Sequence, residues 1–462
     1  MAFVKYNEND IKKRIVVDNP WWQSNEIAKF YQPFPYRAYF ESFHELVRSE
    51  KPRRALVLMG PRRVGKTVML NQSIKKLVDA GVPARKIVFL SLDKPIYSGL
   101  DPEYLIELSL KASGLTHPEG CYFFFDEIQY LKNWENYLKS MVDFYHETKF
   151  IVSGSAAAAL KRKSNESGAG RFTDFVLPPL TFAEFIDMSG KEGMLKHRGQ
   201  ISEAIDIFAF NQEFIKYIHY GGYPEVVMNP EMKDDLERYV TQDIIDKVLL
   251  KDLPSLYGVN DTQEMNSFFN VLAYNTSNEA SMANMERDLQ ISKHLLENYL
   301  EYLQAAFLIR KLSRVDINAR RLKKEQQFKL FLTNVSFRSA MFTPIEATSE
   351  MFGGLVETAI FDQYLHRSYD IRYARWKEGR KTREVDFISI SRATQKPEWA
   401  LEIKWSNSGD TANLKSFLEI HKLTSGWITT INQHDLSQKI KKVPASIMCY
   451  MIGKTPEIIL EG

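Results

Sequence analysis

The sequence of 462 residues is long enough for two or three domains. Its composition, 44% hydrophobic and 26% charged, is typical of a globular protein, and a net charge of +3 is too small to predict nucleic-acid binding by itself. The only two cysteines exclude a disulfide framework and a thiolate zinc site, so a reducing cytoplasm is expected. The chain shows no apolar signal core and no apolar run of membrane-spanning length, so no membrane partner is expected.

The first strong signal is a strand, a glycine-rich loop and a helix in succession, after a helical lead-in expected over residues 1–50. Residues 54–59 predict a buried strand and residues 68–77 predict a helix. Between them the chain matches the phosphate-binding pattern G-x-x-x-x-G-K-[ST], in the context that this P-loop requires. The loop residues are Gly60, Pro61, Arg62, Arg63, Val64, Gly65, Lys66 and Thr67.

This loop predicts ATP and Mg²⁺ as cofactors. Its glycines let the backbone wrap around an anion, and the helix that follows points free N–H groups at the phosphates. Lys66 is expected to bridge the β- and γ-phosphates, and Thr67 is expected to ligate Mg²⁺. Arg62 and Arg63 are expected to face solvent or a partner.

Two further apolar segments, 86–93 and 121–128, predict strands of a parallel sheet that is covered on both faces. The second segment contains Asp126 and Glu127 at its end, the pattern of a Walker B strand. Asp126 is expected to hold Mg²⁺, directly or through water, and Glu127 is expected to polarise the attacking water.

A third strand, 149–155, ends in small polar residues. Ser153 or Ser155 is expected to sense the γ-phosphate, because such sheets bind ligands at the carboxyl ends of their strands. Arg171 follows a glycine-containing loop and has two interpretations. It either reaches nucleotide, in its own chain or in a neighbouring subunit of a homo-oligomer, or it is a surface cation.

Several motifs occur in an order that resembles a known family. They are the P-loop, FFDEIQ at 124–129, SGS at 153–155, AGR at 169–171, LPPLTFAEF at 177–185 and YGGYPEV at 220–226. Together they are similar to prokaryotic AAA-type ATPases with a second, C-terminal domain, and the similarity covers most of the chain after residue 30. The resemblance implies ATP binding in a cytoplasmic protein. One departure is at 329–336 (KLFLTNVS), where the family often has an Asp-Thr-Gly after the strand, so any role of that aspartate is absent or moved.

The middle of the chain predicts helices. After an ATPase core at 51–185, residues 186–255 are expected to form a helical lid, and residues 256–318 a winged helix-like domain with helices at 282–289 and 293–304. The second of these helices carries as many acidic as basic side chains, so a spacer or a nucleotide-coupled lid is favoured over sequence-specific DNA reading. The basic stretch 320–329 is expected either to follow a nucleic-acid backbone or to be solvated surface.

The C-terminal region, 319–462, carries a pattern of acidic residues and a lysine. Glu357 lies in an amphipathic helix, and two alternating strands carry Asp386 on one and Glu402 with Lys404 on the other. If these strands form a hairpin that turns near Gln395, Asp386 lies opposite Lys404 and diagonal to Glu402. Carboxylates at that spacing can share a divalent cation, and the lysine can activate water.

This arrangement resembles the PD-(D/E)XK nuclease superfamily. The resemblance implies that Asp386 and Glu402 are metal ligands for Mg²⁺ or Mn²⁺, that Lys404 is the catalytic lysine and that Glu357 is a supporting ligand. The other interpretation is an alternating strand with a salt-bridged, exposed Glu–Lys pair.

The sequence therefore predicts an α/β protein with a P-loop NTPase parallel-sheet core, a helical lid and winged helix, and a C-terminal α/β restriction-endonuclease-like domain. The favoured function is ATP hydrolysis that controls a metal-dependent nuclease-like domain acting on nucleic acid, DNA rather than RNA. The alternatives are an AAA-type nucleotide switch, or a remodelling ATPase, whose C-terminal domain binds nucleic acid or protein without cutting.

Overall fold

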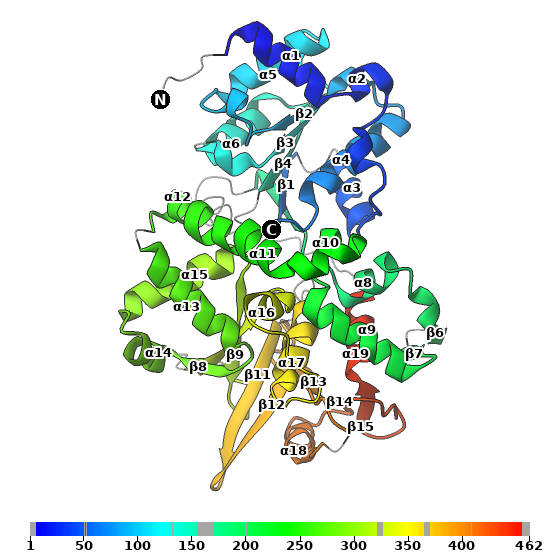
Figure 1. Cartoon of the computed structure of the whole chain (residues 1–462), viewed down its shortest axis with the longest axis vertical. Coiled ribbons are helices and arrows are strands. Elements are labelled where there is room, and N and C mark those ends of the chain that lie inside the picture. The colour runs from blue at the N-terminus through cyan, green and yellow to red at the C-terminus, as the bar shows by residue number, and fades with distance from the viewer. Residues whose placement is uncertain are drawn as a thin grey trace. The chain divides into compact units, whose positions relative to one another are not determined.

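The computed structural model describes residues 6–49, 51, 53–131, 133–154, 170–198, 201–259, 261–320, 327–364, 370–407 and 409–454. These residues fall into two compact units, which divide between Leu177 and Pro178 (Figure 1). Each unit has its own sheet. We describe the units separately.

The first unit is built on a five-stranded parallel sheet with the order β2-β3-β4-β1-β5. Its strands are β1 (Ala55–Met59), β2 (Ile87–Ser91), β3 (Tyr122–Asp126), β4 (Lys149–Gly154) and β5 (Phe172–Val176). Its α-helices are α1 (Glu8–Asp18), α2 (Trp21–Ser24), α3 (Phe40–Arg48), α4 (Lys66–Asp79), α5 (Pro102–Ser113) and α6 (Trp134–Phe144). The predicted parallel core is confirmed. It places the end of β1 between β4 and β5, so that the P-loop leaves the sheet beside the ends of both neighbours.

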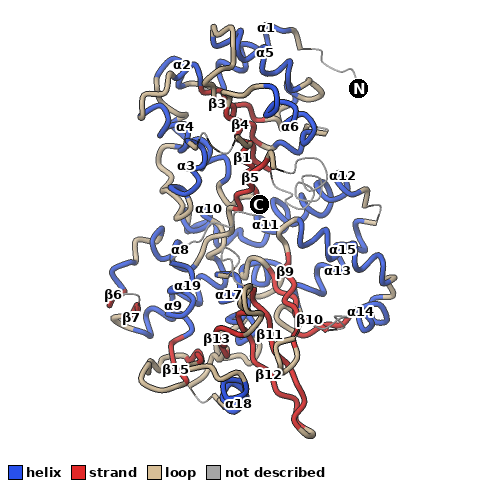
Figure 2. The backbone as a smooth tube through the Cα atoms, turned by 180° about the vertical axis from the view of Figure 1, so that it is seen from behind, coloured by secondary structure: helices blue, strands red, loops and turns tan. Residues whose placement is uncertain are grey.

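The second unit is built on an eight-stranded mixed sheet with the order β15-β14-β13-β12-β11-β9-β10-β8. Its strands are β8 (Glu279–Ser281), β9 (Ile309–Val315), β10 (Gln327–Leu332), β11 (Asp370–Glu378), β12 (Lys381–Ile390), β13 (Pro397–Glu402), β14 (Gly426–Thr430) and β15 (Ile440–Pro444). A separate hairpin joins β6 (Leu195–Arg198) to β7 (Ile201–Ala204). In Figure 2 the long strands β11 and β12 run side by side, as their antiparallel pairing requires.

Helices cover this second sheet and supply most of its core. They are α8 (Phe182–Met188), α9 (Ile207–Tyr220), α10 (Pro224–Met228), α11 (Leu236–Val240), α12 (Leu253–Tyr257), α13 (Thr262–Tyr274), α14 (Met282–Leu289), α15 (Lys293–Ala305), α16 (Ser336–Met341), α17 (Phe352–Gln363), α18 (Ala412–Ile420) and α19 (Ala445–Lys454). Two π-helical stretches, Thr241–Ile245 and Val248–Asp252, lie between α11 and α12.

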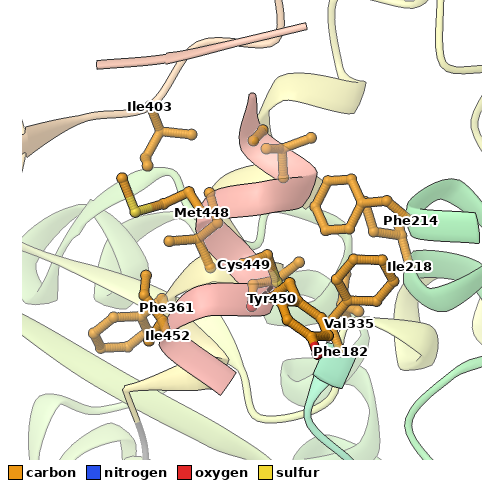
Figure 3. Close-up of a cluster of buried hydrophobic side chains, with 14 of the residues drawn as sticks. Phe182, Phe214, Ile218, Val335, Phe361, Ile403, Met448, Cys449, Tyr450 and Ile452 are labelled. Carbon is orange, nitrogen blue, oxygen red and sulfur yellow. Dashed lines mark hydrogen bonds between the residues drawn. The ribbon is translucent and has the colours of Figure 1, made fainter. Parts of the chain in front are cut away.

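One hydrophobic core joins the two ends of the second unit. Phe182 and Phe214, from α8 and α9, pack with Cys449 and Tyr450 of α19 (Figure 3). The first helices of the expected lid are therefore buried against the C-terminal helix of the same unit. That residues 186–255 act as a lid stays a prediction.

The helices expected at 282–289 and 293–304 are present as α14 and α15, and they follow α13 and the short strand β8. The two strands after them, β9 and β10, are antiparallel partners, as the strands of a wing are. They do not stand apart, because β9 also pairs in parallel with β11, through Arg314 and Val315. The segments expected as separate domains at 256–318 and 319–462 therefore share one sheet.

Candidate functional site

The P-loop has a shape that requires glycine at its first position. Gly60 has a φ of +153°, and a Cβ there would lie 2.1 Å from the carbonyl oxygen of Leu177. Gly65, immediately before α4, has a φ of +96°, a conformation that costs glycine no steric strain. The backbone thus turns sharply before helix α4 begins at Lys66. The N-terminus of this helix favours an anion.

Lys66 lies inside this loop. Its Nζ donates to the carbonyl oxygens of Gly60, at 2.9 Å, and Pro61, at 2.7 Å, and the side chain is buried. Arg37, which precedes α3, donates from Nη1 to the carbonyl oxygen of Val64 at 2.7 Å. Arg37 therefore fixes the P-loop backbone at Val64 from a position earlier in the chain. No local sequence pattern indicated this role.

Asp126 is the centre of a hydrogen-bonded group at the ends of β3 and β4. Its Oδ2 accepts from the Thr67 hydroxyl at 2.8 Å, its Oδ1 accepts from the Ser153 hydroxyl, and the Ser153 Oγ accepts from the Glu127 N–H at 3.2 Å. Burial, and then the neighbouring Glu127 charge, raise the pKa of Asp126 to about 6. The structure thus brings together Thr67 and Asp126, the two residues expected to hold Mg²⁺, and links both to Ser153.

Glu127 has a backbone φ of +57°, which directs the chain sharply away from the sheet. Its carboxylate accepts a hydrogen bond from the side-chain amide of Gln129. Gln129 was not a candidate in the sequence, although it is the last residue of the FFDEIQ motif. Arg63 is exposed at the tip of the P-loop, whereas Ser155 lies outside the described residues.

Arg171 does not reach the P-loop of its own chain. It immediately precedes β5, where its carbonyl oxygen accepts from the Ala55 N–H at 2.8 Å, and its side chain pairs with Asp143 at 3.1 Å. The P-loop leaves the opposite end of β1, which at about 3.3 Å per residue is roughly 16 Å away. The interpretation in which Arg171 acts on nucleotide in its own chain is therefore corrected, because the strand separates the two positions.

The hairpin of the second unit forms, but its register differs from the expected one by two residues. Phe387 lies opposite Leu401, which places Asp386 opposite Glu402 instead of Lys404. Asp386 Oδ2 also accepts from the Ile403 N–H at 2.8 Å.

The reason for the changed register is the turn between the strands. The Ser391 N–H donates to the Lys396 carbonyl oxygen at 2.8 Å, and Gln395 adopts a φ of +56° after the centre of the turn instead of at it. An irregularity in pairing between Ser389 and Ile390 accompanies this turn. Turn geometry sets hairpin register, and a one-residue shift of the turn centre moves each residue's partner by two positions.

A lysine from another strand occupies the space between the acidic side chains. Lys329 Nζ lies 2.8 Å from Glu357 of α17, 2.8 Å from Glu384 of β12 and 3.5 Å from Asp386. Lys329 is only 5% exposed. It therefore fits neither interpretation of the basic stretch 320–329, because it is not solvated surface and it cannot follow a nucleic-acid backbone. Residues 321–326 of that stretch lie outside the described residues.

Glu402 and Lys404 form the other half of this acidic cluster. Lys404 Nζ lies 2.9 Å from Glu402 Oε1, while the buried Glu402 Oε2 has no hydrogen-bond partner among the residues that the structure describes. Burial, and then the nearby Asp386 charge, raise the pKa of Glu402 to about 8, and burial raises the pKa of Glu357 to about 7. All four residues named from the sequence therefore belong to one electrostatically coupled group.

A cavity of about 380 Å³ opens onto part of this group. Glu357, Glu384, Asp386 and Lys329 line it, together with Arg375, which lies 3.5 Å from Glu384. Within the described part of the chain, no three His, Cys, Asp or Glu side chains are arranged as a ready metal site.

Three family models match successive stretches of the chain. Residues 52–186 match an AAA domain. Residues 211–349 and 352–450 match two domains of unknown function, DUF8612 and DUF4143. In the described residues, no helix has the length and apolar character needed to cross a membrane.

Two relatives with similar sequences are described as uncharacterised proteins. An uncharacterised protein of Haemophilus influenzae is 26% identical over 343 residues, which cover 72% of this chain and 78% of that protein. The uncharacterised protein MJ1544 of Methanocaldococcus jannaschii is 25% identical over 348 residues, which cover 73% of this chain and 72% of that protein.

Two solved structures of AAA proteins are more distant. C. elegans PCH-2 and the S. cerevisiae Hsp104–ADP complex are each 13% identical, with TM-scores of 0.28 and 0.31. The alignments cover 41% and 64% of this chain and 58% and 40% of those chains, and scores this low do not establish a shared overall fold. The domain match and the order of the parallel sheet agree with each other, and the first unit is an AAA-type P-loop ATPase domain.

Proposed function

We propose that the first unit hydrolyses ATP with Mg²⁺ and that its nucleotide state controls the second unit. The observation that carries the proposal is the bonded group formed by Thr67, Asp126 and Ser153. It connects the P-loop helix to the ends of two neighbouring strands, which is where a γ-phosphate and its cation bind in this class of site.

The residues present fit Mg²⁺. Asp126 is a buried carboxylate whose raised pKa reflects the cost of holding an unbalanced charge, and the Thr67 hydroxyl lies beside it. These two residues would hold the cation, which would offset charge on the phosphates. Lys66 would bind the phosphates, and Glu127 would orient the attacking water. Arg171, which is far from its own P-loop, would act on the nucleotide of a neighbouring subunit in a homo-oligomer of this cytoplasmic protein.

For the second unit we propose a nuclease-like domain that acts on nucleic acid, with DNA favoured over RNA. Asp386 and Glu402 face each other on adjacent strands, and Glu357 approaches from a helix that precedes them in the chain. Among the described residues, Glu402 Oε2 is buried without a hydrogen-bond partner, and a bound cation would satisfy this oxygen. Asp386, Glu402 and Glu357 would hold Mg²⁺ or Mn²⁺, and Lys404 would position water.

Lys329 supports the alternative, a domain that binds nucleic acid or protein without cutting. Its ammonium already lies 2.8–3.5 Å from three carboxylates, so a divalent cation must compete with it. The helix pair α14–α15 also supports a spacer, because Lys293 of α15 pairs with Glu297, at 3.9 Å, on the same helix. Under this alternative, a winged helix and a closed acidic cluster would transmit nucleotide state to a bound partner.

The ATPase proposal is tested by nucleotide binding and phosphate release. Lys66→Ala is expected to abolish ATP binding, and binding that stays at the wild-type level would refute the P-loop assignment. Glu127→Ala is expected to keep ATP binding and to lose hydrolysis. Loss of both by Glu127→Ala would mean that this residue supports the fold instead of the reaction.

The nuclease-like proposal is tested with labelled single- and double-stranded DNA and RNA, with Mg²⁺ or Mn²⁺ and with or without ATP. Wild type is compared with Lys404→Ala and with Lys381→Ala, which removes the same charge from an exposed position of β12. Cutting that only Lys404→Ala loses would support the nuclease-like site. No cutting, or equal cutting by all three proteins, would leave the non-cleaving alternative.

A further inference from the structure

The first unit contains a second cavity, of about 410 Å³, at the end of the sheet opposite the P-loop. It lies where the parallel strands β1, β3 and β4 begin, beside the last residues of α3 and the chain that follows α6. Figure 1 shows these three strands side by side in the first unit. The P-loop leaves the other end of β1, so this cavity is separate from the nucleotide site described above.

Basic side chains surround the cavity. Arg48, Lys51 and Arg53 are exposed at its rim, and Arg54 and Lys149 are partly buried within it. In the described residues, none of these five cations forms an ion pair, and the only acidic side chain among the lining residues is Glu147. Among the described residues, the cavity therefore carries a concentrated positive charge that a single lining carboxylate does not balance.

The two inner cations differ in how the protein satisfies them. Lys149 Nζ donates to the Ser49 carbonyl oxygen at 2.8 Å, and burial lowers the pKa of Lys149 to about 8. Arg54 Nε is buried and has no hydrogen-bond partner. A buried guanidinium N–H without an acceptor is costly, and an anionic oxygen in the cavity would satisfy it.

We infer that this cavity binds a phosphorylated anion of about nucleotide size, at a site independent of the P-loop. The planar guanidinium groups of Arg53 and Arg54 match pairs of phosphate oxygens, and Lys149 supplies a point charge. The cavity volume lies within the roughly 300–1,000 Å³ range of small-molecule sites. The Tyr122 and Tyr145 side chains line the same cavity and offer aromatic surface to an organic portion of the ligand.

The test uses the full chain with Lys66→Ala, so that the P-loop does not contribute. Pyrophosphate, ADP and a single-stranded oligonucleotide are each titrated by calorimetry into this protein. The same titrations are repeated after adding Arg54→Gln, or Arg53→Gln at the exposed rim, or Lys13→Gln. The last change removes one positive charge from α1, an element that does not line the cavity, and serves as the matched control.

The expected result is saturable binding of pyrophosphate that weakens by about tenfold or more with Arg54→Gln and with Arg53→Gln, but not with Lys13→Gln. Because Arg53 is exposed, its variant gives a result even if Arg54→Gln does not fold. Tighter binding of ADP would identify a free nucleotide as the source of the phosphate, and tighter binding of the oligonucleotide would identify nucleic acid. Absence of saturable pyrophosphate binding, or equal binding by all variants, would overturn the inference.

Discussion

Lys329→Met offers a direct test of the charge balance in the second unit. Methionine keeps the length and the apolar contacts of the lysine side chain but removes its charge. Three carboxylates would then lie together with no ammonium at 2.8–3.5 Å. Removing one partner of a buried ion pair typically costs about 3–5 kcal/mol, because the other charges stay buried and unbalanced.

Hydrogen–deuterium exchange of the amides in β12 and β13 measures this cost locally, which avoids assuming that a chain of two units unfolds in a single step. A loss of about 3–5 kcal/mol corresponds to faster exchange by roughly two to four orders of magnitude. Lys381→Met is the control, because it removes an exposed charge from β12, one of the two strands whose exchange is measured. A change in Lys329→Met no larger than in this control would refute the view that Lys329 stabilises the acidic cluster.

A divalent cation extends the test. If the carboxylates and Glu402 Oε2 can accept a metal, Mn²⁺ should restore slow exchange in Lys329→Met while leaving the wild type unchanged. Equal insensitivity of both proteins to Mn²⁺ would count against the metal site proposed for the nuclease-like domain.

Three further predictions concern the first unit. Gly60→Ala places a Cβ 2.1 Å from the Leu177 carbonyl oxygen. ATP affinity should therefore fall at least about tenfold in a binding titration. Gly81→Ala, where a Cβ would meet no atom within 4 Å, should leave ATP affinity unchanged. Burial, and then the charges of Lys76 and Arg48, lower the pKa of His44 to about 4. Because the unfolded chain takes up this proton below about pH 6.5, the free energy of unfolding of the wild type relative to His44→Gln should fall by about 1–2 kcal/mol from pH 7 to pH 5 in urea denaturation. Arg171→Ala should leave ATP affinity unchanged and slow hydrolysis only at concentrations where chains associate, and an equal loss in dilute protein would contradict its action between subunits.

The parts of the fold that follow from local patterns could be predicted from the sequence. The P-loop and the strands before and after it have continuous apolar runs and a fixed loop spacing, and the structure has them within a few residues of the expected positions. Strand β5 was missed because its residues, FTDFV, include Thr173 and Asp174, which are only partly buried at the edge of the sheet. Strand β5 therefore lacks the continuous apolar run that identified the other four strands of this sheet.

The missing parts of the candidate sites depend on contacts between distant residues. Lys329 of β10 contacts Glu384 of β12 although β9 and β11 lie between these strands, and neither sheet order nor such a contact can be read from one segment. Arg37 likewise contacts the P-loop at Val64 through tertiary packing. The hairpin strands at 383–390 and 398–405 were expected, but their register was not, because it depends on a turn whose geometry the residue types do not fix.

The short pairing between β9 and β11 divides the eight-stranded sheet mechanically into two panels, β8, β10 and β9 on one side and β11 to β15 on the other. Within the described ranges, only Arg314 and Val315 of β9 pair with β11, so few backbone hydrogen bonds resist sliding along this line. Side chains cross it instead, among them Lys329 to Glu384 and Arg375 to Glu279, the latter at 2.6 Å. Shear between the panels would draw the Lys329 ammonium away from the hairpin carboxylates. These ion pairs therefore contribute to the stiffness along this line, and their contribution will weaken with added salt to the extent that water reaches them.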